Sequence, residues 1–153
     1  ALSPTNAFQI IQGLETVTLR MEKHCSNAAK VAEYLSSHEK VSKVIYAGLD
    51  EGEAGVRANK YLKGGHGALC GFELKGGKPS GEKFINNLNM FYHVANIGDA
   101  RSLAIHPATT THSQLSDEDM ESAGVNPSYV RLSIGIEHID DIIEDLKNAL
   151  NAA

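Results

Sequence analysis

A long stretch near the N-terminus constrains the fold more than any other part of the sequence: no proline lies between Pro4 and Ser37, and Gly13 is its only glycine. Ser3 and Pro4 suit the N-cap and the first position of a helix. A helix over residues 5–37 would be roughly 50 Å long at 1.5 Å per residue, whereas a domain of this size has a radius of gyration of only about 15 Å. One end of the helix should therefore extend beyond the domain.

The two halves of this predicted helix differ in their apolar pattern. The second half carries a single apolar stripe, formed by Met21, Cys25, Ala28, Ala29, Val31, Ala32 and Leu35. The first half is apolar nearly all round, through Ala7, Phe8, Ile10, Ile11, Leu14, Val17 and Leu19. A helix that is apolar all round is normally buried, so we expect the projecting end to be covered by protein that this chain does not contain. The alternative is a kink at Gly13 that folds the first half back.

The remainder of the chain alternates strand and helix patterns. Extended segments are predicted over residues 41–46, 68–74, 90–95, 103–105 and 129–135, and helices over 56–62, 79–89, 117–123 and 136–152. Several connections are too short for parallel crossovers. The sequence therefore predicts an α+β fold with a largely antiparallel sheet covered by helices. The glycine-rich segment 64–67 opens onto a strand rather than a helix, so we interpret it as a turn and not as a phosphate-binding loop.

Composition excludes several classes of partner. The chain has 153 residues, enough for one domain with its own core. Its net charge of −5 argues against binding to nucleic acid or to a membrane surface, and no apolar run is long enough to span a membrane. Cys25 and Cys70 stand alone, which favours a reducing, cytoplasmic setting. The first residue is Ala1 rather than methionine, so we expect the chain to be a piece of a longer protein.

Residues 93–114 have the composition of a functional loop, because small and polar side chains interrupt short apolar pieces. The segment contains His93, His106 and His112, but their spacing matches no common metal-binding pattern. We therefore expect structural or hydrogen-bonding roles for these histidines. No serine lies in a G-x-S-x-G nucleophile motif.

A cation follows in the strand pattern at residues 129–135. Strand alternation places Arg131 and Ser133 on the face opposite Val130, Leu132 and Ile134. A forked guanidinium beside a hydroxyl-rich loop suits a carboxylate ligand. The alternative for Arg131 is a solvated residue that points outward from the strand.

Three segments carry a resemblance to a known family. They are NIGDARSLAIHPATTTH at residues 96–112, VRLSIGIEH at 130–138 and GLETVTLRMEKH at 13–24. Through them the chain resembles, essentially from end to end, the pyridoxal-phosphate (PLP) enzymes of cysteine and methionine metabolism, the cystathionine synthase and lyase family. Residues 95–103 and 105–114 are most similar to the branch of O-acetylhomoserine sulfhydrylases.

The resemblance implies that residues 1–153 are the C-terminal, substrate-side domain of such an enzyme, with the aspartate-aminotransferase-like PLP fold. The long N-terminal helix would be the family's interdomain helix. The cofactor-binding domain, with its Schiff-base lysine, would lie upstream. The complete enzyme would use PLP and form a homo-oligomer, specifically a tetramer, whereas this fragment would hold no catalytic residue and would not bind the cofactor.

The resemblance also implies a substrate site. Arg131 would bind the α-carboxylate of the amino-acid substrate, and Asn96 and Thr111 would line the same pocket. Asn96 departs from the serine found there in many lyases and synthases, although an amide can still donate a hydrogen bond to a carboxylate.

The implied reaction replaces the acetate of O-acetyl-L-homoserine with sulfide or a thiol, to give homocysteine or methionine. Methionine γ-lyase and cystathionine γ-synthase or lyase are the alternatives within the family. A stand-alone binding module without chemistry is the alternative from another class, and a lysine-bearing domain directly upstream in the reading frame would exclude it.

Overall fold

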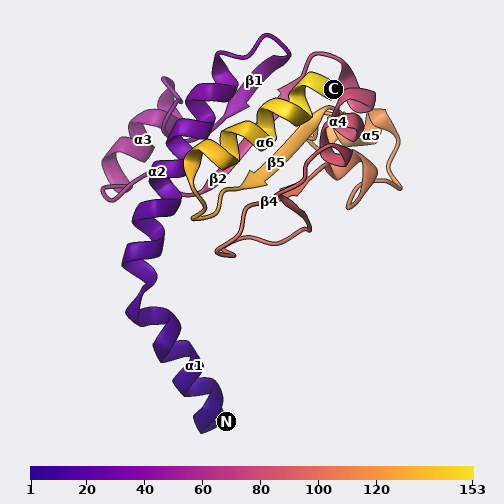
Figure 1. The fold of residues 1–153 in the computed structure, drawn as a ribbon. Coiled ribbons are helices and arrows are strands. Elements are labelled where there is room, and N and C mark those ends of the chain that lie inside the picture. The colour runs from indigo at the N-terminus through magenta and orange to yellow at the C-terminus, as the bar shows by residue number, and fades with distance from the viewer.

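The structure, a computed structural model, describes residues 1–153 and contains one five-stranded sheet (Figure 1). The strands are β1 (Val41–Ile45), β2 (Leu69–Leu74), β3 (Tyr92–His93), β4 (Leu103–Ile105) and β5 (Tyr129–Ser133). Their spatial order is β1-β2-β5-β4-β3, and every neighbouring pair is antiparallel except β3 and β4. The predicted α+β class with a largely antiparallel sheet is confirmed. No helix is both long and apolar enough to cross a membrane.

Three helices cover one face of the sheet: α2 (Val17–Ser36), α4 (Gly77–Asn86) and α6 (Ile139–Ala152). Figure 1 shows α2 and α6 lying side by side over the strands. The α6 side chains Ile142, Leu146 and Leu150 recur at helical spacing and are fully buried in the core beneath. Phe72 of β2 and Phe84 of α4 meet edge to face there, with ring centroids 5.2 Å apart. The shorter helices α3 (Glu53–Tyr61) and α5 (Asp117–Ser122) and the 3-10 turn η1 (Pro107–Thr109) complete the fold.

The other face of the sheet is open over β1 and β2. Because side chains alternate along a strand, Val130 and Leu132 enter the core while Arg131 faces the opposite way, as predicted. Gly71 of β2 pairs with Arg131, and Ile45 of β1 pairs with Gly71, so all three share this face. We call it the open face, formed by Ile45, Leu69, Gly71, Tyr129 and Arg131; the first two of these side chains are each 45% exposed.

The predicted N-terminal helix is two helices, α1 (Pro4–Glu15) and α2, separated at Thr16. Three successive β-branched residues, Thr16, Val17 and Thr18, lower the helix propensity at the break. Ser3 caps α1 as expected, accepting a hydrogen bond from the Asn6 backbone. No residue of α1 is buried, and Figure 1 shows α1 projecting from the body of the molecule. The predicted overhang is confirmed, and the alternative in which a kink folds the first half back is wrong.

Three further helices, α3, α4 and α6, start elsewhere than predicted. The α3 helix begins at Glu53 rather than at residue 56, because Asp50 accepts hydrogen bonds from the Gly52 and Gly55 backbones at its start. Asp50 therefore has a structural role at the start of α3.

The C-terminal helix α6 begins at Ile139, not at Ile136. His138 is its N-cap, with Nδ1 accepting a hydrogen bond from the Asp140 backbone N–H at 3.3 Å, and the Ile136 N–H before it donates to the Ala100 carbonyl at 2.9 Å. The α4 helix spans residues 77–86 instead of 79–89, whereas the predicted Ser116 cap of α5 is present. Residues 64–67 form the expected turn before β2.

Candidate functional site

Arg131 lies on the central strand of the sheet and is half-buried at the open face. Its Nη2 donates a hydrogen bond to the backbone carbonyl of Asn96, 3.2 Å away, and its Nε is buried without a partner. No acidic side chain lies within ion-pair distance of it, and Glu73 of β2 pairs with Lys43. A guanidinium with unused donors and no counter-charge is suited to an external carboxylate, which it can bind through two parallel hydrogen bonds.

A hollow of about 600 Å³ adjoins Arg131 on the open face. Tyr129 lies across Gly71 at its floor, so closely that any side chain at Gly71 would collide with the ring. Burial raises the pKa of Tyr129, which keeps its hydroxyl protonated and able to donate. Most of the remaining lining is apolar, including Ile45 and Leu69. The recess thus combines a mostly apolar lining with three charged side chains, those of Arg131, Lys43 and Asp50.

The structure brings Asn96 to Arg131 through its backbone carbonyl, whereas the contact predicted for its side-chain amide is with the substrate carboxylate. The Asn96 side-chain oxygen accepts a hydrogen bond from the Ile97 N–H at 2.9 Å, and the side chain is exposed. Thr111 lies in the turn after η1, with its hydroxyl 2.9 Å from Nδ1 of His112. No hydrogen bond joins Thr111 to Arg131 or to Asn96. The pocket roles of the Asn96 and Thr111 side chains stay predictions.

His106 has the structural role expected from the sequence. Its ring is fully buried, with Nε2 donating to the Pro127 carbonyl at 2.9 Å and Nδ1 3.0 Å from the Thr109 hydroxyl. Burial lowers its pKa, which favours the neutral ring. Nowhere do three His, Cys, Asp or Glu side chains lie close enough to hold a metal ion. Burial also raises the pKa of Cys70 to about 12, so this thiol is not a ready nucleophile.

Sequence reasoning missed a polar network that joins Ser102 to the segment after β5. The Glu137 carboxylate accepts hydrogen bonds from both the backbone N–H and the hydroxyl of Ser102, at 2.6 and 2.9 Å. The Ser102 hydroxyl in turn accepts from the Gly135 N–H at 2.9 Å. The sequence pointed to Glu137 only through its position inside the segment 130–138. No spacing pattern there predicts that it pairs with Ser102.

Comparison with known proteins identifies the family. The model of the family described as Cys/Met metabolism PLP-dependent enzyme matches residues 1–151. The chain belongs to this family.

Relatives within this PLP-dependent family match nearly the whole chain. It is 55% identical to the O-acetyl-L-homoserine sulfhydrylase of Leptospira meyeri and 48% identical to the homocysteine synthase of Schizosaccharomyces pombe. These matches cover 98% and 99% of the chain but only 34% and 35% of the relatives. The chain thus spans about a third of the length of these relatives.

A solved structure supports the same assignment. It is a putative O-acetylhomoserine (thiol)-lyase from Campylobacter jejuni that contains N'-pyridoxyl-lysine-5'-monophosphate, and it superposes with a TM-score of 0.88 at 43% identity. The match covers 99% of this chain and 36% of that one. The expected fold, that of a PLP-dependent enzyme domain, is confirmed.

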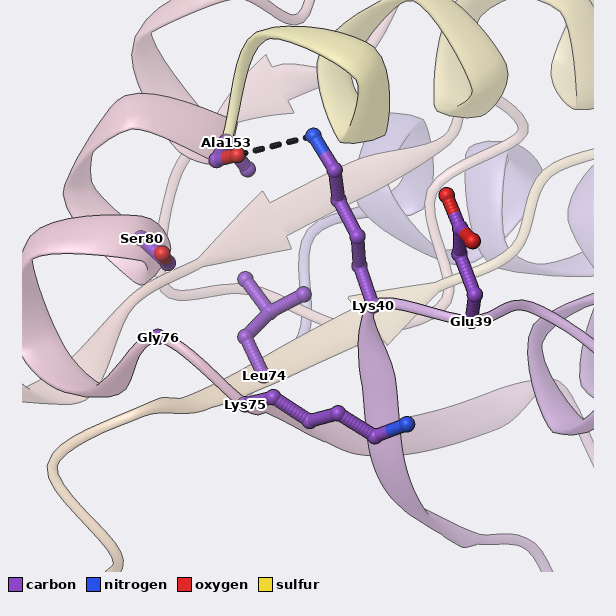
Figure 2. Close-up of a pocket in the computed structure, with 7 residues that line it drawn as sticks. All are labelled: Glu39, Lys40, Leu74, Lys75, Gly76, Ser80 and Ala153. Carbon is purple, nitrogen blue, oxygen red and sulfur yellow. Dashed lines mark hydrogen bonds between the residues drawn. The ribbon is translucent and has the colours of Figure 1, made fainter.

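This chain has no lysine suited to bind the family's cofactor covalently. A Schiff base requires a lysine amine free of other bonds, and no lysine of the chain is buried. Figure 2 shows the half-buried Lys40 at a recess of about 280 Å³ between β2, α4 and the end of α6. Its Nζ donates to the carbonyls of Leu150, Asn151 and Ala153 at 2.9–3.0 Å. All three of its protons are used to cap α6, so Lys40 is a structural residue.

Proposed function

We propose that residues 1–153 form the C-terminal, substrate-side domain of an O-acetylhomoserine sulfhydrylase, in which Arg131 binds the substrate α-carboxylate. The observation that carries this proposal is the guanidinium of Arg131 on the central strand, with a buried, unpartnered Nε and no ion-pair partner. The names of the relatives support the reaction class, because the most similar ones are sulfhydrylases or a homocysteine synthase.

The complete enzyme would replace the acetate of O-acetyl-L-homoserine with sulfide or a thiol and release homocysteine or methionine. PLP supplies the electron sink for this chemistry, and its lysine would lie in a domain outside residues 1–153. The contribution of this chain is to hold the amino acid by its carboxylate, so that the side chain bearing the acetate is correctly oriented. Asn96 and Thr111 would line the same pocket. We place the enzyme in the cytoplasm, as a homotetramer.

The test is to replace Arg131 by alanine and by lysine in the complete enzyme. Truncating one member of a buried, hydrogen-bonded charge pair costs about 2–5 kcal/mol, so Arg131→Ala should lower kcat/KM for O-acetylhomoserine roughly 30- to several-thousand-fold at 1.36 kcal/mol per decade. Arg131→Lys should recover only part of this loss, because lysine offers a point charge without the fork. The measurement is the steady-state rate with sulfide, alongside the melting temperature.

Arg57→Ala is the matched control. The Arg57 guanidinium is exposed on α3 and pairs only with Glu53 of its own helix, so its removal should leave kcat/KM within about twofold. A kcat/KM within threefold of wild type for Arg131→Ala would refute the carboxylate role. Unfolding of that variant would instead mean that the side chain supports the fold.

A further inference from the structure

The loop that follows β3, residues 94–101, is held to β5 and to the segment after it by three hydrogen bonds. Arg131 donates to the Asn96 carbonyl at 3.2 Å, the Gly98 N–H donates to the Ser133 hydroxyl at 3.4 Å, and the Ile136 N–H donates to the Ala100 carbonyl at 2.9 Å. The side chains of this loop are mostly exposed, so these bonds rather than packing define its path. The position of the Asn96 carbonyl, and with it the direction of the guanidinium, depends on them.

Glu137 binds Ser102, the residue that follows the C-terminal end of this loop. Both of its carboxylate oxygens are used by Ser102, the residue between the loop and β4, one by the backbone N–H and one by the hydroxyl. Charge-assisted bonds of this kind are roughly twice as strong as neutral ones. A glutamine at this position would present an amide NH2 to one of the two Ser102 donors, so it could satisfy only one of them.

The backbone is tightly packed at Gly135, where the segment after β5 meets the end of the loop. A Cβ at Gly135 would lie 2.5 Å from the Ser102 nitrogen and 2.6 Å from the Ala100 carbonyl oxygen, both backbone atoms that cannot move away cheaply. The end of the loop and the end of β5 are therefore in direct backbone contact. A displacement of Ser102 would therefore also disturb the Ala100 carbonyl, which holds the loop to Ile136.

The junction is also anchored to α2. The fully buried side chain of Asn27 donates to the carbonyls of Gly135 and Glu137, at 3.0 and 2.9 Å. The segment 135–137 is thus held from the helix side by Asn27, while the Glu137 carboxylate holds the loop on the other side.

We propose that Glu137 is a positioning residue for substrate binding. It acts through Ser102 and the loop 94–101 to hold the Asn96 carbonyl against Arg131, which fixes the guanidinium fork for a carboxylate. This inference rests on the proposed function of Arg131.

The test is Glu137→Gln in the complete enzyme, with O-acetylhomoserine and sulfide. Because a misplacement of about 1 Å can cost on the order of 100-fold, we expect kcat/KM to fall about 10- to 100-fold, chiefly through a higher KM. In an Arg131→Lys background, which lacks the fork, the same change should lower kcat/KM by less than about threefold, since coupled residues are non-additive. Ser102→Ala, which removes one of the two donors, should show a smaller loss in the same direction.

Glu144→Gln is the matched control, since Glu144 on α6 forms no side-chain hydrogen bond or ion pair and undergoes the same carboxylate-to-amide change. Equal losses from Glu137→Gln in the wild-type and Arg131→Lys backgrounds would overturn the positioning role and leave a structural one. If Glu137→Gln does not fold, Ser102→Ala compared in the two backgrounds decides between these two roles. Unimpaired Arg131→Ala would overturn the proposed function itself, whereas impaired Arg131→Ala with unimpaired Glu137→Gln overturns only this inference.

Discussion

His106 shows how a single buried ring makes the fold sensitive to pH. It joins the end of β4 to the segment that leads into β5, through Thr109 on one side and the Pro127 carbonyl on the other. Burial lowers its pKa below the ordinary value of 6.5, and this effect outweighs the Pro127 carbonyl and Glu82, which act to raise it; Lys78 and His93 lower it further. The neutral ring is therefore the form that the folded state prefers.

The free energy of unfolding should depend on pH because of this pKa shift. At pH values between the lowered folded pKa and the unfolded one, the unfolded chain binds more protons, so the free energy of unfolding rises with pH. The stabilisation is complete above about pH 6.5 and is lost as the pH falls through the folded pKa. Urea unfolding of wild type and His106→Gln between pH 7.5 and 5 measures this. The wild type should lose more stability on acidification than the variant, and parallel curves would contradict the assignment.

At the residue scale, strand alternation was enough to predict which way Arg131 faces, because Val130 and Leu132 are unambiguously core residues. The partner of Arg131 could not be predicted in the same way. Asn96 lies 35 residues away in sequence and is contacted through its backbone, which every residue type offers. The Glu137–Ser102 pair also spans 35 residues and depends on how the loop closes against β5.

At the element scale, α1 is a helix without tertiary support. Its apolar side chains Phe8, Ile11 and Leu14 are 54–62% exposed, and none of its residues is buried. The proline-free run over residues 5–37 predicted one long helix and, through its length, the overhang, because a helix of about 50 Å exceeds the size of this domain. The break at Thr16 could not be placed from the sequence, since helix propensities there differ by only a few tenths of a kcal/mol.

Amide hydrogen exchange on residues 1–153 should find residues 5–14 the least protected helical segment, unless self-association buries them, because an isolated helix of this length is marginal in water. Residues 139–152 of α6, which pack on the core, are the internal control. Sedimentation run in parallel distinguishes a monomer from an associated form. Strong protection of residues 5–14 in a monodisperse monomer would contradict the expectation.

At the scale of the whole molecule, the chain contains the carboxylate-binding arginine that we propose, Arg131, but no lysine suited to bind the cofactor. We expect residues 1–153 alone to show no transferase or lyase activity and no specific PLP adduct, since Lys40 is engaged with three carbonyls and the other lysines meet solvent. Borohydride reduction in the presence of PLP, followed by peptide mapping, should yield only scattered, substoichiometric labelling. The complete enzyme serves as the positive control, and one stoichiometrically labelled lysine within residues 1–153 would refute the expectation.

Because β5 is the central strand, the sheet cannot be completed during synthesis until β5 has been made. β5 is the last strand in the chain, yet it alone connects β2 to β4. A nascent polypeptide that ends before Tyr129 can form only two separate strand pairs, β1 with β2 and β3 with β4. Each pair has an unpaired edge that is prone to aggregation. The strand that completes the sheet is also the strand that brings Arg131. A polypeptide shortened before this point would therefore become a substrate for chaperones and proteases rather than a weakened binder.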